Sequence, residues 1–165
     1  MMIHAPQTLQ RNWGEEVIFA QTPTHAGKLL RRKVGTKGGY QLHVKEETHY
    51  LLEGVLRLRQ LNADGLELTR RVSAGEAWTV PPGTVHQEEA IEDSIVIEVG
   101  DPTIEDRYAI TPDPGGLPSM TDEQASDKLA ALAAAFRARA EDCEMLAQQI
   151  AANGLQSLVV NPARS

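Results

Sequence analysis

Polar side chains of the kinds that bind metal ions cluster in one short stretch of the chain. Gln41 and His43 lie two positions apart, and Glu47 and His49 repeat this spacing after a tight turn predicted at Lys45-Glu46. Because side chains alternate across a strand, each pair presents both of its side chains to one face. Burying an unpaired polar group costs about 2 kcal/mol or more. Four such groups facing the inside of a small barrel are therefore explained if a metal ion binds them.

The elements that must position these side chains are short β-strands. From Val17 to Val99 the chain contains runs rich in Val, Ile, Leu and Thr, separated by turn residues such as Pro81-Pro82-Gly83. This pattern predicts an antiparallel, all-β structure. The clearest hairpin joins Leu51–Leu61 to Leu66–Val72 through Asn62-Ala63-Asp64-Gly65, where the Asp-Gly pair favours a tight turn.

One carboxylate lies inside an apolar run. The segment Ser94–Val99 is apolar at nearly every position except Glu98, which predicts a strand buried on both faces. A buried carboxylate needs a partner, so Glu98 is a candidate site residue. A position at a strand edge or on the surface is the alternative for this residue.

The chain changes character after Gly100. Thr111–Pro118 is rich in Pro and Gly and predicts a linker, and Thr121 with Gln124 predicts a capping box that opens a long helix ending at Asn153-Gly154. We therefore expect two parts, a barrel with an N-terminal arm in residues 1–114 and the linker with a C-terminal α-helical extension in residues 115–165.

The predicted helix carries an apolar stripe at heptad spacing that only Arg139 interrupts. Such a stripe packs either across its own barrel or against a second subunit, and the second alternative predicts a homodimer. The stripe consists of Leu129, Leu132, Phe136, Cys143, Leu146 and Ile150.

Composition bounds the class of protein. The chain has 165 residues, enough for one domain with an appendage, and a net charge of −7, which argues against nucleic acid and anionic membranes as partners. No apolar run approaches the ~20 residues that a bilayer requires. Met1–Gly14 has no apolar signal core, and Cys143 is the single cysteine, so we expect a soluble, cytoplasmic protein without an intrachain disulfide.

Two motifs in the β-rich region resemble those of the cupin superfamily. The resemblance implies an all-β double-stranded β-helix, or jelly-roll barrel, with metal ligands Gln41, His43, Glu47 and His86. The first motif is matched by Gly35, Gln41, His43, Glu47 and Gly54, and the second by Gly75, Pro81, Gly83 and His86.

Gln41 stands where cupins usually carry a first histidine, and in this the chain is similar to the phosphomannose isomerase type of cupin domain. Arg11-Asn12-Trp13-Gly14 and Glu105-Asp106-Arg107-Tyr108 also resemble that domain. Two basic groups of that family are missing from Glu46–Tyr50 and after Tyr108. Lys28, Lys45 and Arg107 could replace them or could be solvated surface charges.

The resemblance implies a metal-dependent aldose–ketose isomerase that acts on a small-molecule sugar or sugar phosphate through a metal-bound enediolate. The mixed nitrogen and oxygen donors suit a divalent ion, Zn, Mn, Fe, Co or Ni. His49 is the candidate for moving the proton, and Glu98 or Lys45 could serve instead. The alternative for His49 is that it packs inertly in the barrel.

Two other functions remain open. Without Gln41, the residues His43, Glu47 and His86 form the two-His-one-carboxylate set of non-haem Fe(II) dioxygenases. A sugar-binding cupin without turnover is the third interpretation, because a fold alone does not decide function.

Overall fold

The computed structural model describes residues 5–62, 64–103, 106–111 and 119–154, which form eleven strands and one helix. The strands are β1 (Gln7–Arg11), β2 (Gly14–Gln21), β3 (Ala26–Arg32), β4 (Gln41–His43), β5 (Glu47–Glu53), β6 (Val55–Leu61), β7 (Glu67–Ser73), β8 (Ala77–Val80), β9 (His86–Ala90), β10 (Ser94–Gly100) and β11 (Arg107–Ala109). The helix α1 covers Asp122–Asn153.

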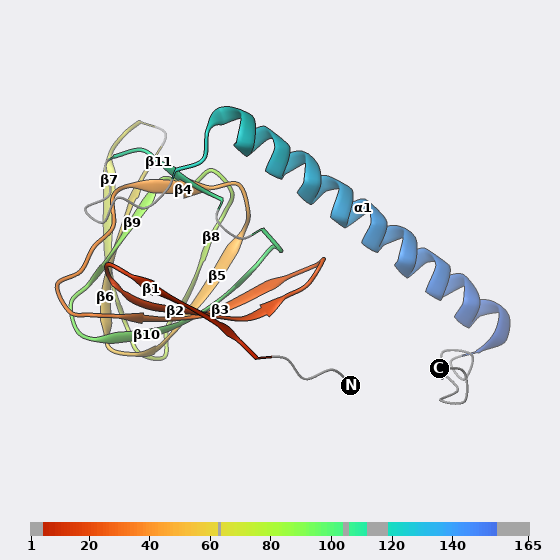
Figure 1. Ribbon diagram of the computed structural model, residues 1–165, viewed down its shortest axis with the longest axis horizontal. Helices are drawn as coiled ribbons and strands as arrows, with labels where there is room; N and C mark the ends of the chain where they lie inside the picture. Colours follow the sequence, from red (N-terminus) through yellow and green to blue (C-terminus); the bar gives the residue numbers. More distant parts are fainter. Residues whose placement is uncertain (1–4, 63, 104–105, 112–118, 155–165) are drawn as a thin grey trace.

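The strands form two antiparallel sheets that enclose a barrel (Figure 1). One sheet has six strands in the order β1-β2-β3-β10-β5-β8, and the other has five in the order β11-β4-β9-β6-β7. Strands that are consecutive in the chain repeatedly fall in different sheets, as β4 and β5 do. This is the double-stranded β-helix of the cupin fold, so the predicted fold class is confirmed, including the C-terminal helix.

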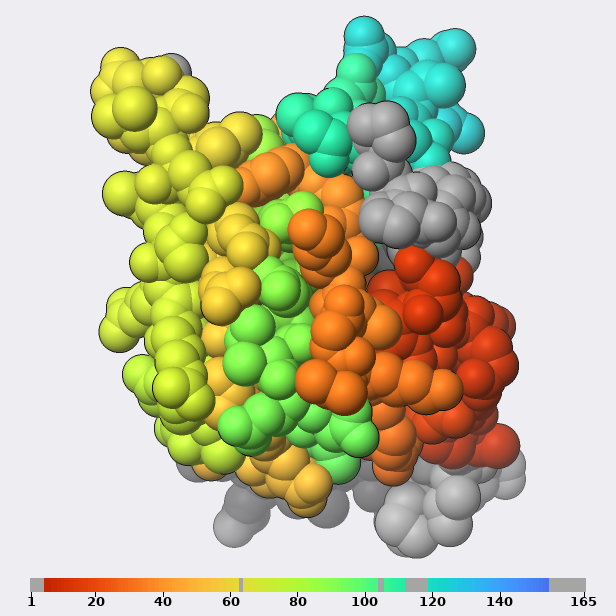
Figure 2. Space-filling view, turned by 90° about the vertical axis from the view of Figure 1, so that its left-hand side faces the viewer, coloured from red at the N-terminus to blue at the C-terminus, as the bar shows by residue number. Residues whose placement is uncertain are grey.

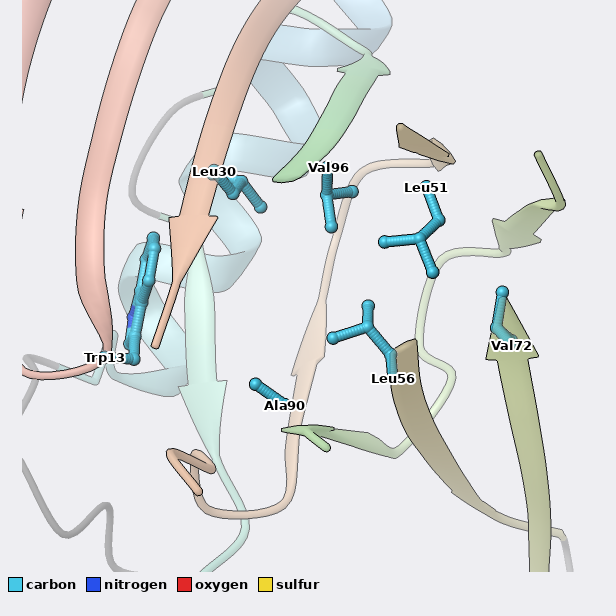
Figure 3. Packing of buried hydrophobic residues seen from close by; sticks show 7 residues of the cluster. All are labelled: Trp13, Leu30, Leu51, Leu56, Val72, Ala90 and Val96. Carbon is cyan, nitrogen blue, oxygen red and sulfur yellow. The ribbon is translucent and has the colours of Figure 1, made fainter. Parts of the chain in front are cut away.

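The interior of the barrel has an apolar part and a polar part, and both occur along β5 and β10. On β5 the inward positions are Glu47, His49 and Leu51, and on β10 the inward Val96 is followed two positions later by Glu98. The apolar ends meet in one cluster of seven residues shown in Figure 3, namely Trp13, Leu30, Leu51, Leu56, Val72, Ala90 and Val96. Strand alternation therefore places a dry core beside a polar half of the same interior.

One sequence prediction about the strands needs correction at Gly54. The run Leu51–Leu61 is two strands rather than one, because Gly54 adopts φ +86° and the chain passes there from the six-stranded to the five-stranded sheet. A Cβ at Gly54 would lie 2.2 Å from the Asp93 carbonyl oxygen, so a side chain does not fit there. The turn at Lys45-Glu46 is likewise a corner between the two sheets.

The hairpin itself is confirmed, since β6 pairs with β7 from Val55↔Ser73 to Leu61↔Glu67. Its tip projects at the upper left of Figure 2. Ala63 of the predicted turn lies outside the described residues. The predicted strand Ser94–Val99 exists as β10, but it is not buried on both faces, because Val99 is 48% exposed while Val96 is fully buried.

Helix α1 begins and ends where local capping chemistry predicts. The Thr121 side chain accepts from the Gln124 backbone N–H, the Gln124 side chain accepts from the Thr121 N–H, and Gly154 provides the C-cap. Its buried residue is Leu132, whereas Phe136 is 46% exposed. Figure 1 shows α1 starting beside β11 and running away from the barrel.

The boundary predicted between residues 114 and 115 falls within 112–118, which lies outside the described residues. Residues 155–165 also lie outside them. Among the helices of the described part of the chain, none is long and apolar enough to cross a membrane.

Candidate metal centre

The polar half of the barrel interior surrounds a cavity of about 390 Å³. All four residues of the predicted ligand set line it, together with His49 and Glu98. Cross-strand pairing brings them together, because Gln41 lies opposite His86 and His49 lies opposite Glu98. The structure thus gathers residues from four strands, β4, β5, β9 and β10, around one space.

His43, Glu47 and His86 form a compact donor group. One ligand atom from each lies within 4.8 Å of those of the other two, and the two imidazole rings have their centres 5.5 Å apart. His43 Nε2 lies 3.9 Å from Glu47 Oε2. Two neutral imidazoles and a carboxylate are a donor set that suits a divalent transition-metal ion, so these residues fit the cofactor that the sequence predicts.

Both imidazoles are oriented through their Nδ1 atoms. His43 Nδ1 lies 3.1 Å from Asp106 Oδ1, and His86 Nδ1 lies 2.9 Å from the Thr84 carbonyl oxygen. Burial lowers the pKa of His86, and the nearby His43 acts in the same direction, so the neutral ring is favoured. When Nδ1–H donates a hydrogen bond to an oxygen, the lone pair of Nε2 is the one that can bind a metal ion. This is the usual arrangement at metal-binding histidines.

Gln41 lies next to the His43, Glu47 and His86 group, but its side-chain oxygen points to Arg107. Its Nε2 lies 3.3 Å from His43 Nε2, and its Oε1 accepts a hydrogen bond of 2.5 Å from Arg107 Nε. The atom through which an amide binds a metal is therefore engaged by a cation. Gln41 is placed beside the donor group and held by Arg107.

Glu47, His49 and Glu98 form a second compact group that shares Glu47 with the first. The Lys45 ammonium forms ion pairs with both carboxylates of this group, because its Nζ lies 3.0 Å from Glu47 Oε1 and 3.4 Å from Glu98 Oε1. It also lies 3.6 Å from Asp106 Oδ1, and the Lys45 side chain is 1% exposed. A buried cation thus already lies among three carboxylates.

These contacts determine which groups can accept a proton. Burial lowers the pKa of Lys45, but the carboxylates of Glu98, Glu47 and Asp106 outweigh it, and the net shift is strongly upward. Lys45 therefore stays protonated and does not suit the role of a base. For Glu98, burial raises the pKa, but Lys28, His49 and Lys45 together hold it well below its usual range.

His49 is buried between an aromatic ring and two carboxylates. Its ring stacks on Trp78 with centres 4.9 Å apart, and its Nε2 lies 3.7 Å from Glu98 Oε2 and 3.9 Å from Glu47 Oε2. Among the described residues its Nδ1 has no hydrogen-bond partner. Burial lowers the pKa of His49, but the neighbouring carboxylates, Glu98 first, raise it overall.

Several charged residues of the cavity were missed by sequence reasoning. Asp106 was noted only as part of a resembling segment, and Glu16, Arg32 and Glu88 were not identified. Glu88 could have been found, because it lies two positions after His86 and so on the same face. Lys28 and Arg107, considered as replacement cations or surface charges, both line the cavity, and Lys28 Nζ lies 3.3 Å from Glu16 and 3.1 Å from Glu98.

The chain is similar to a known protein family in sequence and to solved structures in fold. Residues 29–99 match the family described as "Cupin domain". No curated protein matches the chain significantly. The oxalate decarboxylase of Bacillus subtilis is similar in structure, with 19% identity and a TM-score of 0.58 over 65% of this chain, which spans only 30% of that chain.

A second solved structure is similar over nearly its whole length. KdgF from Halomonas sp. has 26% identity and a TM-score of 0.52, and the match covers 62% of this chain and 92% of that chain. A further oxalate decarboxylase structure from Bacillus subtilis, described by its Mn(II) centres, has 19% identity and a TM-score of 0.54, with 58% of this chain and 27% of that chain covered. The fold is that of the cupins, residues 29–99 match the cupin domain family, and the donor set suits a divalent metal ion.

Proposed function

We propose that this chain is a metal-dependent isomerase that interconverts an aldose and a ketose, or their phosphates. One observation carries the proposal: the donor group and the His49–Glu98 pair share a single cavity, and Glu47 belongs to both groups. A site that can hold a substrate carbonyl therefore lies beside a pair that can move a proton. The cavity volume of about 390 Å³ suits a small molecule.

The proposed metal residues are His43, Glu47 and His86, with Gln41 as a fourth, weaker ligand. When bound there, a divalent ion would polarise a substrate carbonyl and make the hydrogen on the neighbouring carbon more acidic.

The side chains around the cavity have separate roles in this proposal. His49 takes the proton from the carbon next to the carbonyl and returns it to the former carbonyl carbon, while the hydroxyl proton moves between the two oxygens. The Glu98 carboxylate, 3.7 Å from His49 Nε2, stabilises the imidazolium that forms. Lys45 holds Glu47 and Glu98 in position through its ion pairs. The reaction is redox neutral and consumes no oxygen.

A second candidate function rests on the donor group alone. His43, Glu47 and His86 are two histidines and one carboxylate, as in non-haem Fe(II) dioxygenases, and the Gln41 oxygen is engaged by Arg107. Non-catalytic sugar binding is the third candidate. An experiment that separates all three must follow both isomerisation and oxygen consumption.

The test incubates the Mn, Zn, Co and Fe forms without oxygen in deuterated water with a panel of sugars and sugar phosphates. We expect isomerised product with deuterium on the carbon that received the proton, and conversion should fall at least ~100-fold in His49→Gln. His25→Gln, which changes an exposed histidine, is the control. Oxygen consumption by the Fe(II) form without any isomerisation would replace the proposal with the dioxygenase, and binding without either reaction would favour the non-catalytic protein.

We also propose that the chain forms a homodimer through α1. Apart from the buried Leu132, the large apolar residues of the stripe stay uncovered in the single chain, since Leu129, Phe136 and Leu146 are 48%, 46% and 41% exposed. An uncovered apolar face of this length is typical of an association surface. The cytoplasmic location stays a prediction.

A further inference from the structure

The start of α1 forms part of the wall of the cavity. Ser119, Met120, Gln124 and Lys128 line it together with the strands of the barrel. Gln124, Lys128 and the buried Leu132 are spaced by four residues and so lie on one side of α1, and Met120 lies just before the N-cap Thr121. One face of the helix therefore lies against the barrel and includes Leu132, whereas the other large stripe residues Leu129, Phe136 and Leu146 stay exposed.

This wall is fixed to strand β11. The Met120 N–H donates to the Arg107 carbonyl oxygen at 2.9 Å, and the Ala109 N–H donates to Ser119 Oγ at 2.9 Å. Met120 is 7% exposed, as a core residue would be. The start of α1 and the segment around β11 form one continuous surface in Figure 2. The position of Lys128 over the cavity is thus set by contacts next to Arg107, which itself holds Gln41.

The charge of the cavity favours a negatively charged ligand. The described lining residues include five cationic side chains, Arg11, Lys28, Arg32, Arg107 and Lys128, and five carboxylates. The buried Lys45 ammonium contacts three of these carboxylates, so the cations exceed the carboxylates by one before any metal ion binds, and a divalent ion would raise the excess to three. An acidic ligand reduces this excess inside a space where charges interact more strongly than in water.

We propose that residues 119–128 form one wall of the ligand site and that Lys128, from that wall, binds the anionic group of an acidic ligand, a carboxylate or a phosphate. This proposal deepens the proposed function and rests on it for the metal and the cavity, but it does not depend on isomerisation. The wall lies beyond residues 29–99, which match the cupin family. It is therefore an addition to that domain, and this addition sets the specificity of the cavity.

The test measures binding by calorimetry to the full chain loaded with Mn(II). The probes are D-glucuronate and D-glucose, which differ in one carboxylate, and inorganic phosphate, which separates the two sources of negative charge. We expect D-glucuronate or phosphate to bind more tightly than D-glucose. Lys128→Ala should weaken binding of the preferred acid about tenfold, the effect of losing one charge-assisted hydrogen bond.

Two variants serve as controls. Lys128→Arg keeps the charge and should retain most of the affinity, and Arg137→Ala removes one positive charge from an exposed position of the same helix and should change nothing. Affinity for Mn(II) alone should be the same in all three variants. The proposal is overturned if no acidic probe binds more tightly than D-glucose, or if Lys128→Ala matches Arg137→Ala.

These outcomes are separable from those of the isomerase test. A preference for acids that depends on Lys128, without any isomerised product, keeps this proposal and overturns the proposed function. Isomerisation of a neutral sugar, without any preference for acids, keeps the proposed function and overturns the role given to Lys128.

Discussion

At the residue scale, the candidate metal centre depends on groups that never touch the ion. Asp106 is 1% exposed, accepts from the backbone N–H groups of Val44 and Lys45 at 3.2 Å, and lies 3.1 Å from His43 Nδ1. Its carboxylate therefore fixes both the corner between the sheets and the direction of the His43 ring. Burial raises the pKa of Asp106, but His43 and Lys45 hold it below the usual value, so it is a carboxylate at neutral pH.

Replacing Asp106 tests this orienting role. Asp106→Asn keeps the size of the side chain but weakens its hold on the His43 ring, and we expect the affinity for Mn(II) or Zn(II) to fall about 10–100-fold. Calorimetric titration of the metal-free protein measures the change. Asp101→Asn, which removes a carboxylate that accepts from the Glu46 N–H outside the cavity, is the matched control. Equal affinities in the two variants would contradict the role given to Asp106.

Replacing Lys45 tests how the buried carboxylates are balanced. Lys45→Met leaves Glu47, Glu98 and Asp106 without the ammonium between them, and we expect the free energy of unfolding to fall by about 3–5 kcal/mol. Urea unfolding of the metal-free protein at neutral pH measures the loss. Lys37→Met changes an exposed lysine, and its effect should stay within ~0.5 kcal/mol. A Lys45 variant as stable as the Lys37 variant would show that the carboxylates are not charged as described.

At the element scale, cross-strand ion pairs join β6 to β9. Arg57 lies directly opposite Glu89, and Arg59 also reaches the same carboxylate, with distances of 3.0 Å and 2.6 Å. The hydrogen bond from Arg59 is the main reason that the pKa of Glu89 lies below its ordinary value, and Arg57 acts in the same direction. These contacts stabilise the pairing of the strand that presents His86.

The pH dependence of this contribution follows from the sign of the shift. A lowered pKa in the folded state means that Glu89 stabilises the fold above its ordinary value of 4.5, and the contribution is lost as the pH falls through the folded-state pKa. We expect Glu89→Gln to be less stable by up to about 1 kcal/mol at neutral pH. Melting temperatures measured from neutral to acidic pH should converge for the two proteins, and a constant difference would contradict the assignment.

At the scale of the whole molecule, α1 links the cavity to the proposed dimer. One face of its first turns lines the cavity, and its apolar stripe continues along the exposed remainder of the helix. Because the contacts of the first turns with β11 are made within one chain, a second copy is free to cover the stripe.

Charged substitutions in the stripe test the dimer. Phe136→Glu combined with Leu146→Glu places charges inside the proposed interface, and we expect a dimer of the native chain to dissociate into monomers. Light scattering coupled to size exclusion measures the mass. Met145→Glu changes a side chain that is 64% exposed and lies outside the stripe, so it should leave the dimer intact. A native chain that is already a monomer, or a double variant that stays dimeric, would refute the assignment.

Features that depend on local geometry could be predicted from the sequence. The bounds of α1 follow from Thr121, Gln124 and Gly154, because capping bonds join residues that are close in the chain. The sharing of one cavity by Gln41, His43, Glu47 and His49 followed from strand alternation, and the place of His86 beside them followed from the resemblance to cupins.

Contacts between groups that are distant in the chain could not be predicted from the sequence. Asp106 contacts a histidine 63 residues away, and Lys45 contacts Glu98 at a separation of 53 residues. Such pairs depend on how two sheets close on each other, and no local pattern encodes that. The same holds for Lys128, whose place on the cavity wall results from the docking of α1 on β11. The spacing of side chains along each strand is a property of the backbone, whereas the balance of charges inside the barrel is a property of its packing.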